Sequence, residues 1–398
     1  MARLFVLLSL ACLPALPALA PVQGVFERMR FDRYANSQSL GRVVWSPEPP
    51  SAQLGVAFFE WLHQLERAGE RARPDERSAS AASVLVTPRL SLKQATALAT
   101  IPSASLVPLH LPLQPLPESS PSSGVLWVGV GEGVGVGGEG RGTGEASPSP
   151  LAAPDVDAAT VERAMRAWVR SALSTEGLGL CPFTQNDRIA AVGLQGVKAA
   201  PILHVTSQAT TLSALLVDCF RAILKMVEGG EDGYSSIILS APAWDSEWDA
   251  WRDAVFPMLE ASVLATDLGR TLGVVCFHPH YSTPDPAFLA RHRFGHMHSI
   301  DTLRSWTEAE APELSGRLDD TRLAEAANQM RRAPHAMVNV LWSRQLEAAE
   351  TKRKSSELYV RNLERILEGG GNDGIFFSAD ALVVCTHQLL AHPGSLVV

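Results

Sequence analysis

The sequence predicts an α/β or α+β fold, in which a small mixed sheet with flanking helices is followed by a mainly helical C-terminal half. Two patterns support this prediction. Between residues 157 and 277, helical periodicity alternates with short apolar runs rich in β-branched residues, as in sheets that pack helices against their faces. After Thr283 the pattern is helical almost throughout.

The predicted elements follow from these periodicities. An amphipathic helix is expected over residues 53–72, where Phe58, Leu62 and Leu65 recur at a spacing of three to four, and a shorter helical pattern covers 91–101. The main domain should then contain, in order, a helix over 157–174, strands over 188–197 and 201–207, a helix over 211–230 that stops at a glycine pair, a strand over 235–242, a helix over 245–263 and a strand over 271–277.

Changes in composition divide the chain into six segments. They are a signal peptide (1–20), a transit-peptide-like segment (21–44), a partly helical N-terminal region (45–101), a Pro/Ser/Gly-rich low-complexity linker (102–150), a globular domain (151–374) and an apolar C-terminal tail (375–398). Within the linker, Gly133, Gly135 and Gly138 match the G-x-G-x-x-G pattern of dinucleotide-binding proteins. The stretch that follows, EGRGTGEASPSP, is unsuited to opening the required helix, so we reject that match.

The first two segments resemble a targeting leader. The first 20 residues combine a basic Arg3, an apolar run and a final Ala-Leu-Ala, which are the marks of a signal peptide. The next stretch is rich in arginine and contains only Glu27 and Asp32 as acidic residues, a composition typical of transit peptides. A signal followed by a transit sequence is similar to the bipartite leaders of plastid proteins in algae with secondary plastids. Secretion is the alternative.

The overall composition excludes several classes of protein. A net charge of -8 and a pI of about 5.8 argue against a nucleic-acid binder that relies on phosphate neutralisation. The chain has five cysteines and no CxxC pair, which excludes a disulfide-stapled miniprotein and gives no support to a zinc knuckle. The apolar tail is interrupted by Asp380 and His387, and no stable membrane span is expected in the mature chain.

Cys181 is the first candidate for chemistry. It follows a predicted helix in the stretch GLGLCPFTQND, on a Leu-Cys-Pro-Phe corner. A thiolate there would act as a nucleophile or a metal ligand if its surroundings stabilised the charge. A free cysteine also packs well as a small buried side chain, so all three interpretations stay open.

A second candidate group follows the last predicted strand. In α/β sheets, ligands bind beyond the carboxyl ends of the strands, and the FHPHY stretch places His278, His280 and Tyr281 at such an end. In an extended segment the two histidines point the same way, so they could share one ion. The alternative is that one histidine packs and the other is solvated.

A third group combines histidines and arginines further along the chain. His292 and His296 are one helical turn apart, which suits a metal if the segment is helical. In RRAPH, Arg331, Arg332 and His335 surround a Pro-fixed turn, and a guanidinium group there would suit a carboxylate or phosphate. A helix is expected after this turn. The alternative for both groups is a solvated basic surface.

Three motifs together resemble a known family. LCPF, FHPHY and RRAPHAMVNVLW, followed by SELYVRNLERILEGGG, occur in the order seen in an uncharacterised family catalogued as domain of unknown function 1415. The resemblance covers residues 157–371. It favours the plastid over secretion, because that family occurs in bacteria and in plastids, and it implies no reaction. The chain departs from the family pattern at Thr184, Ala333, Ala336 and Trp342, where the family usually has Ala, Ser, Pro and Arg.

The residues that match the family motifs make up the predicted site. We expect a small-molecule enzyme in which Cys181 is a nucleophile or metal ligand, His278 is an acid/base partner or ligand, and Arg332 binds an anionic group of the substrate, with Tyr281 beside them. A metal held by Cys181, His278 and His280 would be zinc or iron. The alternative is a non-catalytic plastid protein that binds a cofactor or a partner, with these motifs as structural corners.

Overall fold

A computed structural model describes residues 42–45, 51–71, 83–87, 113–115, 125–129, 151–291, 295–352 and 354–369. The predicted signal peptide, the predicted helix over 91–101, the G-x-G-x-x-G match at Gly133, Gly135 and Gly138, and the apolar tail lie outside the described residues. His292 lies outside them as well. None of the described helices has the length and apolar character needed to span a membrane.

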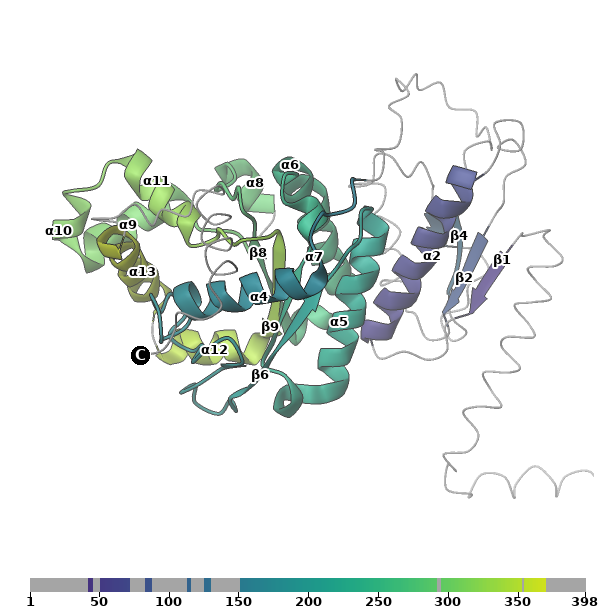
Figure 1. Ribbon diagram of the computed structural model, residues 1–398, viewed down its shortest axis with the longest axis horizontal. Coiled ribbons are helices and arrows are strands. Elements are labelled where there is room, and N and C mark those ends of the chain that lie inside the picture. Colours follow the sequence, from purple (N-terminus) through teal and green to yellow (C-terminus); the bar gives the residue numbers. More distant parts are fainter. Residues whose placement is uncertain are drawn as a thin grey trace, which may run out of the picture.

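The N-terminal elements form a small sheet beside one long helix (Figure 1). These elements are β1 (Arg42–Trp45), α2 (Ser51–Arg71), β2 (Ser83–Thr87), β3 (Leu113–Pro115) and β4 (Val125–Gly129), with strand order β1-β2-β4-β3. Helix α2 confirms the amphipathic pattern, since Phe58, Phe59 and Leu62 are buried. Strands β3 and β4 fall within residues 102–150, the segment predicted from its composition to be a low-complexity linker.

The main domain follows the predicted alternation of helices and strands. It contains α4 (Ala158–Trp168) with a π-helical turn (Val169–Leu173), β5 (Ile189–Ala190), β6 (Ala200–Thr206), α5 (Leu212–Gly233), β7 (Ser236–Ser240), α6 (Trp248–Ala250) with a π-helical turn (Trp251–Val255), α7 (Phe256–Ala265) and β8 (Leu272–Phe277). The end of α5 agrees with its glycine pair, because Gly230 interrupts the helical backbone with a φ of 65°. The strand predicted over 188–197 is reduced to two residues.

The last part of the described chain is mainly helical, with one exception. It contains α8 (Pro286–Arg291), α9 (Ile300–Glu310), α10 (Pro312–Ser315), α11 (Asp320–Gln329), β9 (Met337–Trp342), α12 (Ser343–Lys352) and α13 (Ser355–Gly369). The prediction of a helix directly after RRAPH was wrong, because MVNVLW forms β9 and a helix begins only at Ser343. Four of the six β9 residues are buried, and such short apolar runs do not distinguish a central strand from a helix.

The five-stranded sheet is mixed, as predicted, with the order β5-β6-β7-β9-β8. Strands β6 and β7 are parallel, and β9 is antiparallel to both β7 and β8. Strands β6, β7 and β8 therefore run in one direction. Their carboxyl ends meet the amino end of β9 at one edge of the sheet, which we call the carboxyl edge.

Each face of the sheet belongs to a different hydrophobic core. Because side chains alternate along a strand, Val274 and Cys276 of β8 join the larger core, which includes residues of α5 and α7. Phe277 joins the smaller core instead, where its ring lies 5.6 Å from that of Trp168. Helix α4 covers this second face and runs across the sheet in Figure 1.

The N-terminal helix joins the larger core. Phe59 of α2 packs on Phe220 of α5, with ring centroids 5.3 Å apart. A Cβ atom at Gly55 would lie 1.9 Å from the Phe220 ring, so glycine permits this close approach of the two helices.

Candidate functional site

Two main-chain hydrogen bonds assemble the carboxyl edge of the sheet. Ala241 N–H, just after β7, donates to Ala336 O at 2.8 Å, and His278 N–H, just after β8, donates to Arg331 O at 3.1 Å. The first bond extends the β7–β9 ladder by one pair beyond Ser240 and Met337, and the second joins the FHPHY stretch to Arg331, at the start of the segment that leads into β9. The RRAPHA segment is therefore held between the loop after β7 and the FHPHY stretch.

His278 is fully buried at this edge, and both ring nitrogens are hydrogen-bonded. Nδ1 accepts from His280 N–H at 3.0 Å, so Nε2 carries the proton and lies 3.0 Å from Trp244 O. Burial lowers the pKa of His278 to about 4. In this arrangement His278 has no lone pair left for a proton or a metal ion, contrary to the role that the sequence suggested.

Tyr281 is also buried, and its ring belongs to an aromatic group beside His278. The Trp248 ring centroid lies 5.2 Å from that of His278 and 5.0 Å from that of Tyr281. The phenol oxygen accepts a hydrogen bond from Met297 N–H at 2.8 Å, and burial raises the pKa of the Tyr281 phenol above its ordinary range. These contacts fix the FHPHY turn, so the buried Tyr281 side chain has a structural role at the carboxyl edge.

His335 and Asp245 form a pair that the sequence did not indicate as a site. His335 Nδ1 lies 2.7 Å from Asp245 Oδ2, and Asp245 Oδ1 accepts from Ala336 N–H at 2.7 Å. A carboxylate only accepts hydrogen bonds, so Nδ1 carries the proton and Nε2 keeps its lone pair in the neutral ring. Nε2 has no hydrogen-bond partner among the described residues.

The sequence contained a signal for this pair, although a weak one. His335 was visible in the RRAPH motif, and Asp245 follows the predicted strand over 235–242 at its carboxyl end. The 90 residues between the two gave no reason to join them. Only the placement of β9 beside β7 brings them together.

The predicted anion-binding arginine is already paired in this structure. Arg332 Nη1 and Nη2 contact the two carboxylate oxygens of Glu325 at 2.6 and 3.3 Å, and Nε lies 3.4 Å from Tyr281 O. An anion would have to displace Glu325 to occupy this guanidinium. We therefore assign Arg332 to fixing α11 against the FHPHY turn.

Arg331 turns toward the helical part of the domain. Its guanidinium carbon lies 5.3 Å from the Phe277 ring centroid, and Nη2 donates to the Tyr359 hydroxyl at 3.1 Å. Its Nε is buried with no hydrogen-bond partner among the described residues. Arg331 thus joins the end of β8 to α13.

Cys181 lies in a tight turn on the other side of the sheet. Its N–H donates to Leu173 O at 2.9 Å, and its carbonyl accepts from Thr184 N–H at 3.2 Å, with Pro182 at the second position of the turn, where proline is favoured. Cys181 is half-buried and packs at the border of the smaller core, as Val275 does. The structure thus places Cys181 and the ring of His278 on opposite faces of the sheet.

The metal site expected from Cys181, His278 and His280 is not brought together by the fold. His280 is exposed, with its ring centroid 5.9 Å from that of His278. Among the described residues, no three His, Cys, Asp or Glu side chains form a group that could hold a metal ion. His296, the described member of the other predicted pair, is buried beside the rings of Phe256 and Phe288.

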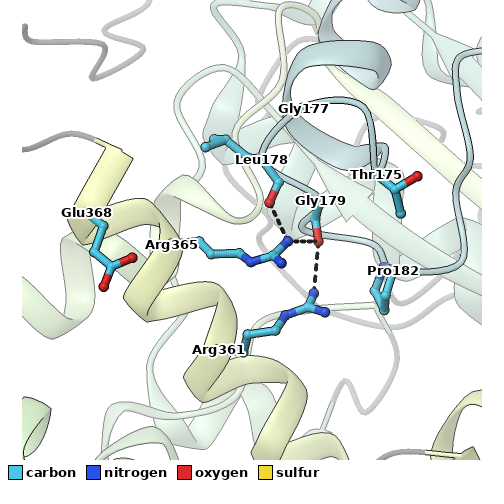
Figure 2. Close-up of a pocket in the computed structure, with 8 residues that line it drawn as sticks. All are labelled: Thr175, Gly177, Leu178, Gly179, Pro182, Arg361, Arg365 and Glu368. Carbon is cyan, nitrogen blue, oxygen red and sulfur yellow. Dashed lines mark hydrogen bonds between the residues drawn. The ribbon is translucent and has the colours of Figure 1, made fainter.

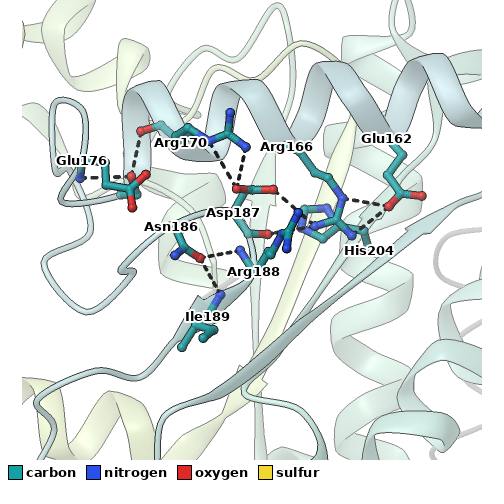
Figure 3. A network of polar contacts seen from close by, with 10 residues as sticks. Glu162, Arg166, Arg170, Glu176, Asn186, Asp187, Arg188, Ile189 and His204 are labelled. Atoms are coloured by element: carbon teal, nitrogen blue, oxygen red, sulfur yellow. Dashed lines mark hydrogen bonds and ion pairs between the residues drawn. The ribbon is translucent and has the colours of Figure 1, made fainter. Parts of the chain in front are cut away.

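Asp187 anchors the segment that follows the LCPF turn to α4 (Figure 3). Its side chain is 6% exposed and lies 2.8 Å from Arg170 Nη2 and 3.4 Å from Arg166 Nη1. The Asp187 carbonyl accepts from His204 Nε2 at 2.9 Å. Burial raises the pKa of the Asp187 carboxyl, but the hydrogen bond and charge of Arg170 outweigh it, and the net direction is downward.

A pocket of about 530 Å³ lies between the LCPF turn and α13 (Figure 2). Its walls include Pro182 of the turn and Arg361, Arg365 and Glu368 of α13. Sequence reasoning missed this pocket, because the arginines were visible only as the polar face of a helix.

At the opposite edge of the sheet, Trp342 Nε1 donates to Tyr234 O at 2.8 Å. The Trp342 side chain is buried and contributes to the larger core.

Comparison with family models, with curated proteins and with solved structures gives no match.

Proposed function

We propose that this protein is a small-molecule enzyme in which His335 acts as a general base. The observation on which the proposal depends is the hydrogen bond between Asp245 and His335 Nδ1. It fixes the imidazole in the tautomer whose Nε2 has a lone pair to accept a proton, and it holds the ring in one orientation. The His335 side chain is 15% exposed, so a substrate or water can approach it.

The position of the pair also supports a functional role. Both residues lie on loops at the carboxyl edge of the sheet, where α/β proteins commonly bind ligands. Asp245 is held by Ala336 N–H as well as by His335, and Trp244 beside it accepts from the buried His278. In this arrangement His278, Tyr281 and Trp248 are structural supports that hold the loop of Asp245 in place.

The reaction that suits this geometry is the removal of a proton from water or from a hydroxyl group of the substrate. Nε2 takes the proton, and the oxygen forms a bond to the carbonyl carbon or phosphorus of an ester. The bond from that atom to the leaving-group oxygen breaks, and the imidazolium gives its proton to that oxygen. Cys181 has no part in this step, because it lies across the sheet. In this proposal Asp245 and His335 take the place of Cys181 and His278, the pair expected from the sequence.

Hydrolysis of activated esters by the full-length chain tests this proposal. Wild type, His335→Gln and Asp245→Asn are compared with p-nitrophenyl acetate and p-nitrophenyl phosphate as substrates. We expect His335→Gln to reduce the rate about 100-fold or more and Asp245→Asn to reduce it less, in line with the contribution of general bases. His280→Gln is the matched control, because this exposed histidine lies at the same edge.

A second readout does not depend on the choice of substrate. Diethyl pyrocarbonate acylates accessible neutral imidazole, so His335 and His280 should react while buried His278 is protected. A wild type that hydrolyses neither ester, or one whose rate is unaffected by His335→Gln, would contradict the proposal. The non-catalytic binding function would then be favoured.

We also propose, from the sequence, that the protein belongs to the family it resembles and is located in the plastid. The likeness of LCPF, FHPHY and RRAPH to domain of unknown function 1415 supports a plastid protein, as does the leader composition. Import of a fusion of residues 1–44 to a fluorescent protein, followed in an alga with secondary plastids, tests the location. Fluorescence in the medium would favour secretion.

A further inference from the structure

We infer that the pocket beside the LCPF turn binds a small molecule through its oxyanion group, a phosphate or a carboxylate. Arg361 and Arg365 lie one helical turn apart on α13, and Figure 2 shows both side chains extending toward the turn that contains Gly179. This inference does not depend on the proposed role of His335, because the two sites share no residue.

The hydrogen bonds of Arg365 leave part of its guanidinium available. Nη1 donates to Leu178 O at 2.6 Å and to Gly179 O at 3.0 Å. Nε and Nη2 have no partner among the described residues, and no carboxylate there forms an ion pair with Arg365. These two nitrogens form the fork that binds phosphate or carboxylate oxygens in pairs.

Gly179 allows the turn and the arginine to come this close. Its φ is +63°, and a Cβ atom there would lie 2.4 Å from Arg365 Nη1. The contact with the two carbonyls therefore fixes the plane of the guanidinium. An arginine held in this way loses less conformational freedom on binding than one without such hydrogen bonds.

The charges of the pocket favour an anionic ligand. Arg361 donates to Gly179 O at 2.9 Å and adds a second positive charge, while Glu368 adds one negative charge to the wall. The net charge of these three side chains is positive, so an anion is attracted. A volume of about 530 Å³ suits a small metabolite.

Calorimetric titration of the full-length chain with inorganic phosphate, and separately with acetate, tests the inference. We expect at least one of them to bind, and Arg365→Gln to weaken its binding about tenfold, the value typical of a charged hydrogen-bonded pair. Phosphate alone would indicate a phosphorylated ligand, and acetate alone a carboxylated one. Arg317→Gln is the control, since this arginine is exposed and lies elsewhere on the surface.

A second variant separates binding from a structural role of the arginine. Glu368→Gln removes the negative charge from the pocket wall, so it should strengthen anion binding about two- to fivefold. A loosened turn would not produce this gain. The inference is overturned if neither anion binds the wild type, if Arg317→Gln weakens binding as much as Arg365→Gln, or if Glu368→Gln leaves the affinity unchanged.

Discussion

His335 and His278 lie at the same edge of the sheet in opposite tautomers. His335 donates from Nδ1 to Asp245, whereas His278 accepts at Nδ1 from His280 N–H and donates from Nε2 to Trp244 O. The difference follows from what each Nδ1 meets, a carboxylate or a main-chain N–H. Nε2 of His335 thus keeps its lone pair, whereas both ring nitrogens of the buried His278 are hydrogen-bonded.

The tautomer of His335 should depend on Asp245. In Asp245→Asn the carboxylate is replaced by an amide that can donate as well as accept, so Nδ1–H is no longer required. We expect long-range ¹H–¹⁵N spectra to show the Nδ1–H form in the wild type and a mixture in the variant. Asp249→Asn is the control, because the carboxylate of Asp249 pairs with Arg252 and not with His335. Identical His335 spectra in all three proteins would contradict the assigned pair.

His278 should make the protein less stable in acid. Its pKa falls from the ordinary 6.5 to about 4 on folding, so between these values the unfolded chain binds the proton and the folded chain does not. Stability therefore rises with pH through this window, and is lost as the pH falls from about 6.5 to about 4, by up to about 3 kcal/mol.

The measurement is urea denaturation at pH 7.5 and pH 4.5 for wild type and His278→Gln. The variant loses packing and one hydrogen bond, so it should be less stable at pH 7.5 by about 1–3 kcal/mol. Its further loss at pH 4.5 should be smaller than that of the wild type. His204 and His298 also have lowered pKa values, but they titrate in both proteins. Equal losses would show that His278 is not the titrating group.

Asp187 should stabilise the fold more than an exposed carboxylate does. In Asp187→Asn, Arg166 and Arg170 lose their buried partner, and we expect the free energy of unfolding at pH 7 to fall by about 1–3 kcal/mol. Asp249→Asn is the matched control, since Asp249 is 83% exposed and also pairs with an arginine. Its loss should be about 0.5 kcal/mol or less.

The stabilisation of the fold by Asp187 should also depend on pH. Because its pKa is lowered from 3.8, its contribution is present above that value and is lost as the pH falls through the folded-state pKa. The difference in the free energy of unfolding between wild type and Asp187→Asn should therefore become smaller as the pH falls. A variant as stable as the wild type at pH 7 would contradict the stabilising role of this network.

Alkylation should distinguish the three described cysteines. Cys181 is half-buried, whereas Cys219 and Cys276 are buried, and burial raises the pKa of the Cys276 thiol to about 12. We expect iodoacetamide at pH 8 to modify Cys181 in the folded chain and the other two only in urea. Peptide mapping by mass spectrometry assigns each site. Modification of Cys276 in the folded chain, or protection of Cys181, would contradict this arrangement.

The order of elements was readable from the sequence because it depends on local patterns. The apolar spacing of α2, the alternation from α4 to β8 and the placement of FHPHY after a strand were all predicted and are present in the structure. The glycine pair at the end of α5 was readable for the same reason, because a positive φ at Gly230 is a property of one residue.

Tertiary structure decided which of these residues meet. Strand β9 enters the sheet between β7 and β8, and only this insertion places His335 beside Asp245. Because side chains alternate between the two faces of a sheet, Phe277 and His278 at the end of β8 point to opposite faces. The His278 side chain therefore points away from the smaller core, which Cys181 borders. The sequence alone determined which residue types stand at strand ends and turns. The partners of these residues depended on the order of the strands and on the face of the sheet to which each side chain points. Burial across the whole sheet sets both, and no local sequence pattern shows them.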